Sequence, residues 1–289
     1  MVLEECPLIN QRVILNIVHA MGYVAIWPAL YALGVSVLTW WLFVSQLPDA
    51  VSIGYLLFCA HSCYLLDRVK VSDTRHDPAD SLALPIRTML FVRWAKQIRL
   101  LIIAELAFAS IAGWFIHPLL VFIPILALCV VHLYAGRGAT PQSPRLKDLP
   151  GLKAFIIASG HISLAFAVLI ANYNDQLTNF SWPSLLILIS IWLIVAGDAA
   201  LCDIDDHDAD RVYQTKSLSV LLGKSCAWRI SFALISAGSI VMIINQPSAM
   251  GYSFSLLMIV STLVTQKNTN HRDFVDARLL PIALFAVWI

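Results

Sequence analysis

Five aspartates crowd into nine residues directly after a long apolar segment. On a helix, at about 100° per residue, Asp203, Asp206 and Asp210 fall on one face. Asp205 and Asp208 point elsewhere. Three like charges on one stripe repel each other, so a cation is required. Carboxylates that share a face suit Mg²⁺, which combines a few of them with waters and the oxygens of a substrate phosphate. The run therefore predicts chemistry on a diphosphate, and the alternative is a merely solvated helix end.

The composition of the chain is that of an integral membrane protein. Of 289 residues, 59% are apolar and 13% are charged, with a mean hydropathy of +0.78, which leaves too little polar surface for a soluble domain of this size. A net charge of +1 gives no argument for a nucleic-acid partner. The six cysteines show no close CxxC spacing, so neither a disulfide framework nor a zinc site is expected. The acidic residues Glu4 and Glu5 near the start are unlike a cleaved signal peptide, so we expect the first apolar segment to be retained.

Nine apolar segments are candidate membrane-spanning helices, because roughly 20 apolar residues cross a bilayer as a helix. We expect an all-α, polytopic bundle that forms a single integral-membrane domain over residues 1–289. Pro28 should kink the first segment, and the last segment is short for a span. The nine segments are Val13–Leu42, Ala50–Leu66, Leu100–Ile116, Pro118–Ala135, Ala154–Tyr173, Trp182–Leu201, Ile230–Ile244, Tyr252–Val264 and Leu279–Ile289.

All 19 Lys and Arg residues fall on one side of this map. They precede the first span or follow the second, fourth, sixth and eighth spans, and the other loops contain none. The positive-inside rule places this side in the cytoplasm or its topological equivalent. We therefore expect the amino terminus inside, the carboxyl terminus outside, and cytoplasmic loops at about 67–99, 136–153, 202–229 and 265–278.

The segment Asp203–Gly223 resembles the second aspartate motif of the UbiA superfamily of membrane prenyltransferases. In that pattern an Asp-Ile-x-Asp-x-x-x-Asp-Arg run precedes a Thr-Leu-Pro-Val-like segment and a glycine, and the register holds here without a gap. The resemblance implies a UbiA-like bundle with a central cavity open near the cytoplasmic side, where Asp203, Asp206 and Asp210 hold Mg²⁺. This chain departs from the family pattern at three positions, none of which is a carboxylate. Ser217 replaces the usual Thr, Ser219 the usual Pro and Gln214 a common Gly.

The first aspartate motif of that family, usually Asn-x-x-x-Asp-x-x-x-Asp at the end of the second helix, is degenerate here. With Asp67 as its central aspartate, Cys63 stands in place of Asn and Val71 in place of the last Asp. Asp67 is a candidate metal ligand and, with Asp206 and Asp210, a catalytic residue. Asp73 replaces the missing carboxylate only if the helix unwinds, because six residues of regular helix turn it about 120° off the Asp67 face. The alternative for Asp73 is a solvated loop carboxylate.

Basic and polar residues beside these motifs are candidates to bind the substrate. Lysine offers phosphate a point charge and three donors, and the segment 145–153 resembles a lysine-bearing segment of the family. For the basic residues the alternative is an anchor at the membrane surface. Asp198 lies eight residues before Asp206, about 80° around the helix, and so could face the same cavity. The candidates are Arg68, Lys147, Lys153, Lys216, Tyr64 and Asp198.

Two further segments have two interpretations each. Residues 83–96 mix apolar and basic side chains as an interfacial helix does, and they are expected either to cap the site or to anchor at the membrane surface. Glu105 lies within an apolar span, where an ionisable group is costly. We expect Glu105 to form a hydrogen bond with His161 or His132 rather than to act on substrate.

The resemblance implies a Mg²⁺-dependent prenyltransferase of isoprenoid biosynthesis. It would ionise a prenyl diphosphate and transfer the prenyl group to a lipophilic, aromatic acceptor within the bilayer. The degenerate first motif leaves open a terpene cyclase of UbiA type, which uses the same ionisation. A non-catalytic membrane scaffold or a transporter is the third interpretation, although no internal repeat typical of transporters is visible.

Overall fold

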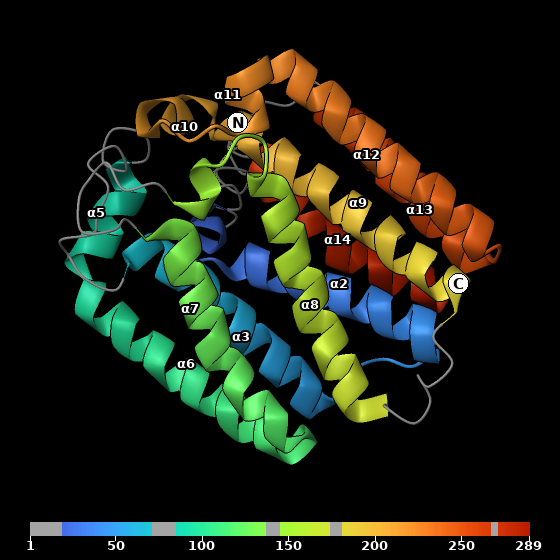
Figure 1. Ribbon diagram of the computed structural model, residues 1–289, viewed down its shortest axis with the longest axis horizontal. Helices are drawn as coiled ribbons and strands as arrows, with labels where there is room; N and C mark the ends of the chain where they lie inside the picture. Colours follow the sequence, from blue (N-terminus) through green and yellow to red (C-terminus); the bar gives the residue numbers. More distant parts are fainter. Residues whose placement is uncertain (1–18, 71–84, 137–144, 174–180, 267–270) are drawn as a thin grey trace, which may run out of the picture.

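The computed structural model describes residues 19–70, 85–136, 145–173, 181–266 and 271–289, and the elements in these ranges are all helices (Figure 1). The all-α prediction is therefore confirmed for this part of the chain. The long helices are α2 (Ile26–Val44), α3 (Ala50–Val69), α6 (Ala95–Ile116), α7 (Ile123–Ala135), α8 (Lys153–Tyr173), α9 (Trp182–Asp205), α12 (Lys224–Asn245), α13 (Ala249–Thr265) and α14 (His271–Trp288). The shorter helices are α5 (Pro85–Arg93), α10 (His207–Tyr213), α11 (Leu218–Leu222) and the 3-10 turns Pro118–Phe122 and Leu146–Asp148.

Seven helical segments among the described residues are long and apolar enough to cross a membrane. They are α2, α3, α6, α8, α9, α12 and the continuous run Pro118–Ala135 that includes α7. The helix α13 has 17 residues, and α14 carries four charged residues in its first half, so both differ from the other seven. The described part of each of the nine predicted segments lies wholly or largely within one of these helical segments, and the chain is a multi-pass integral membrane protein.

The kink predicted from Pro28 lies at Ala25, three residues before the proline, on the side where the proline ring excludes the helical hydrogen bond to residue 24. The backbone leaves the helical conformation at Ala25, where φ is 64° and ψ is 19°, and α2 begins at Ile26. Pro28 therefore lies in the first turn of α2. Proline is accepted there because its missing N–H group would have no partner within the helix.

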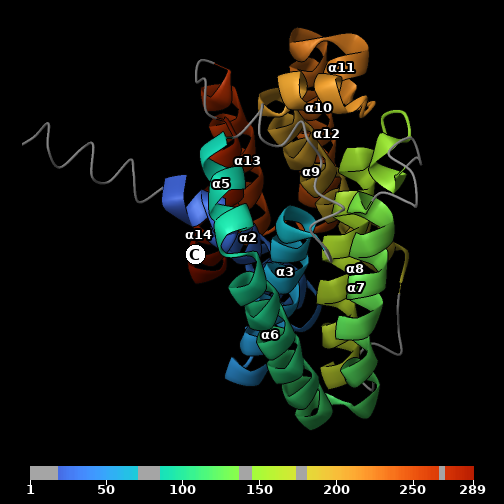
Figure 2. The same ribbon diagram turned by 90° about the vertical axis from the view of Figure 1, so that its left-hand side faces the viewer.

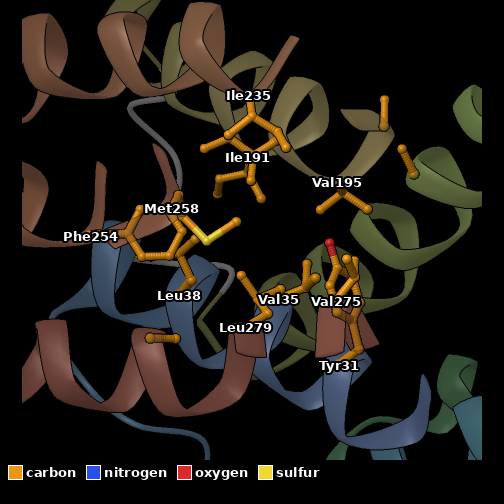
Figure 3. Close-up of a cluster of buried hydrophobic side chains, with 14 of the residues drawn as sticks. Tyr31, Val35, Leu38, Ile191, Val195, Ile235, Phe254, Met258, Val275 and Leu279 are labelled. Atoms are coloured by element: carbon orange, nitrogen blue, oxygen red, sulfur yellow. The ribbon is translucent and has the colours of Figure 1, made fainter. Parts of the chain in front are cut away.

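The core of the bundle is built around α9, which packs most extensively against α12 and also contacts α8. Figure 3 shows Ile191 and Val195 of this helix among buried side chains of α2, α12, α13 and α14. The backbones of α9 and α12 approach closely at Gly238, where a Cβ atom would lie 2.7 Å from the carbonyl oxygen of Ser190. The Ser190 hydroxyl donates to the Gly238 carbonyl at 2.7 Å. Small residues permit this approach, as is common between membrane helices.

Large apolar side chains remain exposed on the outer faces of α6 and α7. Among the most exposed are Phe108, Trp114, Phe115, Ile125 and Leu133. An apolar surface of this extent requires a lipid environment or a partner. The short helices α5, α10 and α11 lie toward one end of the bundle (Figures 1 and 2), where the charged residues described next are found.

Candidate active site

A cavity of about 520 Å³ lies among α3, α7, α8 and α9, and α2, α5, α10 and α14 add to its walls. This volume is within the range of small-molecule sites. Its apolar walls include Ile123, Leu126, Val130, Ile156, Ile157 and Leu164. Its ionisable lining comprises six basic residues, Arg68, Lys70, Arg87, Lys147, Lys153 and Arg272, and six aspartates, Asp67, Asp198, Asp203, Asp206, Asp210 and Asp276. Asp198 pairs with Arg278, which does not line the cavity, so the other lining residues have a formal charge of only +1. A bound polyanion with more than one negative charge requires additional positive charge.

Three of the predicted aspartates surround one ammonium group. Lys153 Nζ lies 2.8 Å from Asp203 Oδ1, 2.9 Å from Asp210 Oδ2 and 3.5 Å from Asp206 Oδ2. The expected continuous helix does not occur here, because α9 ends at Asp205 and α10 begins at His207, with Asp206 between them. The three carboxylates still converge. The cation that their mutual repulsion requires is supplied, in this structure, by Lys153.

The other two aspartates of the run point away from this ammonium. The side chain of Asp208 is 84% exposed, and its Oδ2 lies 3.4 Å from Lys224 Nζ. Asp205 Oδ2 accepts a hydrogen bond of 2.7 Å from the backbone N–H of Arg272. Asp205 therefore helps to join the end of α9 to the start of α14, and Asp208 lies on the surface.

Arg272 of α14 binds the same aspartate cluster and was not predicted. Its Nη1 atom donates to Asp206 Oδ1 at 2.7 Å. Burial alone would raise the pKa of Asp206, but the charges of Arg272, Lys153 and Arg87 outweigh it and lower that pKa to about 2. Asp206 therefore stays ionised, and α14 contributes directly to the cavity.

Asp67 lies at the end of α3 with two lysines beside it. Its Oδ1 atom is 3.0 Å from Lys70 Nζ and 3.7 Å from Lys147 Nζ. The Lys147 ammonium also lies 6.0 Å from the ring centroid of Tyr134. Burial lowers the pKa of Lys147 to about 8, and Asp67 opposes this effect. Asp73, the other predicted carboxylate of this motif, lies outside the described residues.

The side chains at the aspartate cluster provide hard oxygen donors for a metal, but not a preformed cage. Within the described ranges, no three His, Cys, Asp or Glu side chains are grouped closely enough to hold an ion by themselves. Asp203 Oδ2 is buried and has no hydrogen-bond partner among the described residues. The donor chemistry thus suits Mg²⁺, whereas the position between the carboxylates is taken by Lys153.

Two predicted substrate-binding residues have other surroundings. Arg68 lines the cavity, but its guanidinium donates to the backbone carbonyls of Gly22 and Tyr23, so it holds the segment before α2. Lys216 is exposed and is not among the residues that line the cavity. Its carbonyl oxygen accepts a hydrogen bond of 2.8 Å from Gly151. The structure therefore does not bring Lys216 to the aspartates.

Tyr64 and Asp198, also predicted, both line the cavity. The Tyr64 hydroxyl lies 2.8 Å from His161 Nε2. Asp198 accepts a hydrogen bond of 2.9 Å from Tyr31 and pairs with Arg278 of α14. Asp198 is 1% exposed, and its charge is balanced within the protein, which indicates a structural role.

The predicted partners of Glu105 are wrong. Its carboxylate lies 2.8 Å from His61 Nδ1 and accepts a hydrogen bond of 2.9 Å from Ser62. Both partners are on α3, so this contact joins α3 to α6. Neither His61 nor Glu105 lines the cavity, and the expectation that Glu105 is structural agrees with this position.

The predicted interfacial segment contains α5, which contributes Arg87, Thr88 and Phe91 to the cavity lining. Phe91 is buried against α3 and α6. Because α5 both packs on the bundle and lines the cavity, its position favours a cap over the site rather than an anchor at the membrane surface.

The sequence interpretation missed Lys70, Arg272 and Asp276. Lys70 follows Asp67 by three residues, a spacing that places the two on one helix face. Arg272 and Asp276 have the corresponding four-residue spacing on α14. This periodicity was the available signal, but it does not reveal which other helix these residues face.

Comparisons with solved structures place this fold among known ones. The chain is similar to a UbiA homolog from Aeropyrum pernix K1 in its apo form, with a TM-score of 0.62 and 16% identity, covering 90% of this chain and 96% of that one. It is similar to a UbiA homolog from Archaeoglobus fulgidus bound to GPP and Mg²⁺, with a TM-score of 0.64 and 13% identity, covering 93% and 99%. The same homolog bound to DMAPP and Mg²⁺ gives a TM-score of 0.59 and 14% identity, covering 94% and 98%. No protein-family model and no curated protein matches the sequence.

These similarities extend over nearly the whole chain but rest on few identical residues. They agree with the resemblance found in the segment 203–223. The chain has the fold of the UbiA homologs.

Proposed function

We propose that this protein is a UbiA-superfamily prenyltransferase that acts on a prenyl diphosphate with Mg²⁺. The observation that carries the proposal is the convergence of Asp203, Asp206 and Asp210 with basic residues at the charged part of an otherwise apolar cavity. A structural neighbour binds GPP or DMAPP together with Mg²⁺, which supports the same substrate class here.

The residues that would hold Mg²⁺ are Asp203, Asp206 and Asp210, with Asp67 as a further ligand. Asp73 stays a predicted ligand from the sequence. When bound, Mg²⁺ would neutralise charge on the departing diphosphate. Apart from Asp198, which pairs with Arg278, the lining residues have a formal charge of only +1, so a metal would also supply the positive charge that a diphosphate needs in this cavity.

The basic residues around Asp67 are suited to the phosphate groups. One carboxylate, Asp67, faces two ammonium groups, Lys70 and Lys147, so this cluster has a formal charge of +1. In the other cluster three carboxylates face Lys153 and Arg272, which gives −1. The cavity is thus polarised, with an anion-binding side at Asp67 and a cation-binding side at the aspartate run.

The apolar walls would hold the prenyl chain and exclude water. Breaking the C1–O bond leaves the electron pair on the diphosphate oxygen and an allylic cation on the prenyl group. A carbon of the acceptor ring then forms a bond to C1, and the ring gives one proton to the released diphosphate. Lys147 and Arg272 stabilise the diphosphate electrostatically as its charge grows. Tyr64 and His161 line the same cavity among its apolar walls.

The orientation in the membrane follows from the basic residues and is part of the proposal. The site would open toward the cytoplasm, with the amino terminus on the same side and the carboxyl terminus opposite. The prenyl diphosphate would enter with its charged head from that side, and a lipophilic acceptor would come from the bilayer.

The proposal is tested with the purified protein, Mg²⁺ and a panel of geranyl, farnesyl and geranylgeranyl diphosphates. Diphosphate release and lipid-soluble products are followed with and without aromatic acceptors. We expect release that depends on Mg²⁺ and on an acceptor, together with a prenylated product. No release across the panel would contradict the proposal and favour a scaffold or transporter.

A terpene cyclase of UbiA type is the second candidate. The altered first motif favours it, since Cys63 lines the cavity near Asp67 where the family has Asn. A cyclase would release diphosphate without any acceptor and would yield a cyclic hydrocarbon or alcohol. The acceptor-free arm of the same experiment therefore separates the two enzymes.

A further inference from the structure

We propose that Lys153 occupies the metal position of the aspartate cluster in the free protein, so that a divalent cation binds there only together with a diphosphate. This inference rests on the proposed function and adds an order of binding to it. The diphosphate would draw the ammonium group off the carboxylates, and the metal would then take its place. Metal affinity at this site would thus be set by Lys153.

The first support is geometric. Lys153 Nζ makes two contacts shorter than 3.0 Å, to Asp203 and Asp210, and a third of 3.5 Å to Asp206. A magnesium ion bonds to carboxylate oxygens at about 2.0–2.1 Å. An ion held by these same oxygens would therefore lie in the space of the ammonium group or directly beside it. Two cations cannot share that space, since their repulsion in a buried site is strong.

The second support is an unused ligand. Asp203 is 1% exposed, and its Oδ2 atom has no hydrogen-bond partner among the described residues. A buried carboxylate oxygen without a partner is costly. The cost is removed when a cation or a water binds to it. Asp203 thus offers one oxygen to Lys153 and keeps the other available for a ligand.

The third support is the position of Lys153 itself. It is the first residue of α8, and it lines the cavity together with Lys147 and Arg272. Its side chain has four flexible methylene groups and a compact charge, so the ammonium can turn from carboxylate to phosphate without moving the helix. A diphosphate is the polyanion for which the proposed site is suited. Its arrival would add negative charge that both Lys153 and the metal can neutralise.

The experiment measures Mn²⁺ bound to the full-length protein by equilibrium dialysis, with protein-bound metal counted by electron paramagnetic resonance. Three proteins are compared, each without and with inorganic diphosphate: wild type, Lys153→Met and Lys153→Arg. Methionine keeps an unbranched apolar stem and removes the charge, whereas arginine keeps the charge. Lys224→Met is the matched control, because Lys224 pairs with the surface residue Asp208.

Without diphosphate, we expect Lys153→Met to bind Mn²⁺ at least tenfold more tightly than wild type, and Lys153→Arg and Lys224→Met to bind as weakly as wild type. Inorganic diphosphate should strengthen Mn²⁺ binding to wild type at least tenfold and to Lys153→Met much less. Circular dichroism and the thermal midpoint check the fold of each variant. Should Lys153→Met not fold, Lys153→Gln, which also removes the charge, takes its place in the same comparison.

Tight Mn²⁺ binding by wild type without diphosphate, within twofold of Lys153→Met, would overturn this inference and leave the proposed function intact. An absence of Mn²⁺ binding in every protein, even with diphosphate, would overturn both. Prenyl transfer is not measured, so a wrong substrate or acceptor does not affect the result.

Discussion

The two acidic clusters of the cavity differ in how their charge is balanced. At the end of α3 a single carboxylate, Asp67, is placed between two lysines. At the end of α9 three carboxylates share Lys153, and one of them also binds Arg272. The first cluster has a positive excess and the second a negative one. Clusters that resemble paired aspartate motifs in sequence can therefore have opposite electrostatic roles.

This difference gives the degenerate first motif a physical interpretation. The residues that replace its usual ligands, Cys63 and Val71, cannot serve as hard oxygen donors. Lys70, three residues after Asp67, instead brings positive charge to the same place. We therefore expect variants of the two clusters to differ in both size and kind of effect.

The largest effect on turnover is expected from Asp210→Asn. The change removes one negative charge from the metal-binding side, and loss of several kcal/mol of metal stabilisation corresponds to about a 1,000-fold lower rate. The loss is measured as the rate of diphosphate release from the prenyl diphosphate that the wild-type protein uses fastest. Asp208→Asn is the control, since that side chain is 84% exposed, and it should retain wild-type turnover. An equal loss of turnover in both variants would show that Asp210 contributes no more than a surface aspartate.

Asp198, a cavity carboxylate outside both clusters, tests whether a position in the cavity lining is enough to make an aspartate functional. Asp198 is buried against Arg278, so Arg278→Met leaves an unpaired buried charge and should cost about 3–5 kcal/mol of stability. The thermal midpoint in detergent measures this. The double variant Asp198→Asn with Arg278→Met should recover much of the loss. If it stays as unstable as the single variant, the pair is not the cause.

Asp67→Asn is expected to lower turnover by about 10- to 100-fold, the effect of one charge-assisted interaction of roughly 1.5–3 kcal/mol. The loss should be smaller than for Asp210→Asn, because Asp67 is a single carboxylate between two cations. The rates of diphosphate release by the two variants, measured in parallel at saturating Mg²⁺, give the ratio of the two losses. A loss as large as that of Asp210→Asn would make the two clusters equivalent and break the comparison.

The smallest of these effects is expected for Lys147→Met, with about tenfold weaker binding of inorganic diphosphate. The lysine lies on the anion-binding side, so the intrinsic metal affinity should change less than the diphosphate affinity. Isothermal titration measures both. Lys96→Met is the control, since Lys96 is exposed and does not line the cavity. If Lys147→Met changed only the metal affinity, the assignment of Lys147 to the anion-binding side would be wrong.

The helices were largely predictable because apolar runs of membrane length have few alternatives. The residues of the second motif were predictable for a similar reason, as a spacing of three and four residues keeps Asp203, Asp206 and Asp210 together even though α9 ends within the run. The break at Ala25 agrees with the kink predicted from Pro28, because proline cannot donate to the carbonyl four residues earlier; only the exact residue at which the helix breaks was not predictable.

The partners across the bundle could not be predicted from local spacing. Arg272 lies 66 residues from Asp206, to which it donates, and a basic residue at a membrane boundary is equally typical of a surface anchor. Arg68 donates to backbone carbonyl groups, which every residue has, so no residue type in the sequence indicates its partners. Lys153 was predicted to bind substrate, but its place between three carboxylates depends on how α8 packs against α9.

The central claim is that the aspartate run binds a prenyl diphosphate through a divalent metal. The direct measurement is equilibrium binding of an unreactive thiolo analogue of geranyl diphosphate to wild type, Asp210→Asn and Asp208→Asn, each with Mg²⁺ and with a chelator. The account predicts Mg²⁺-dependent binding that is equal in wild type and Asp208→Asn and at least tenfold weaker in Asp210→Asn. Binding that is the same in all three proteins, or that does not require Mg²⁺, would contradict it.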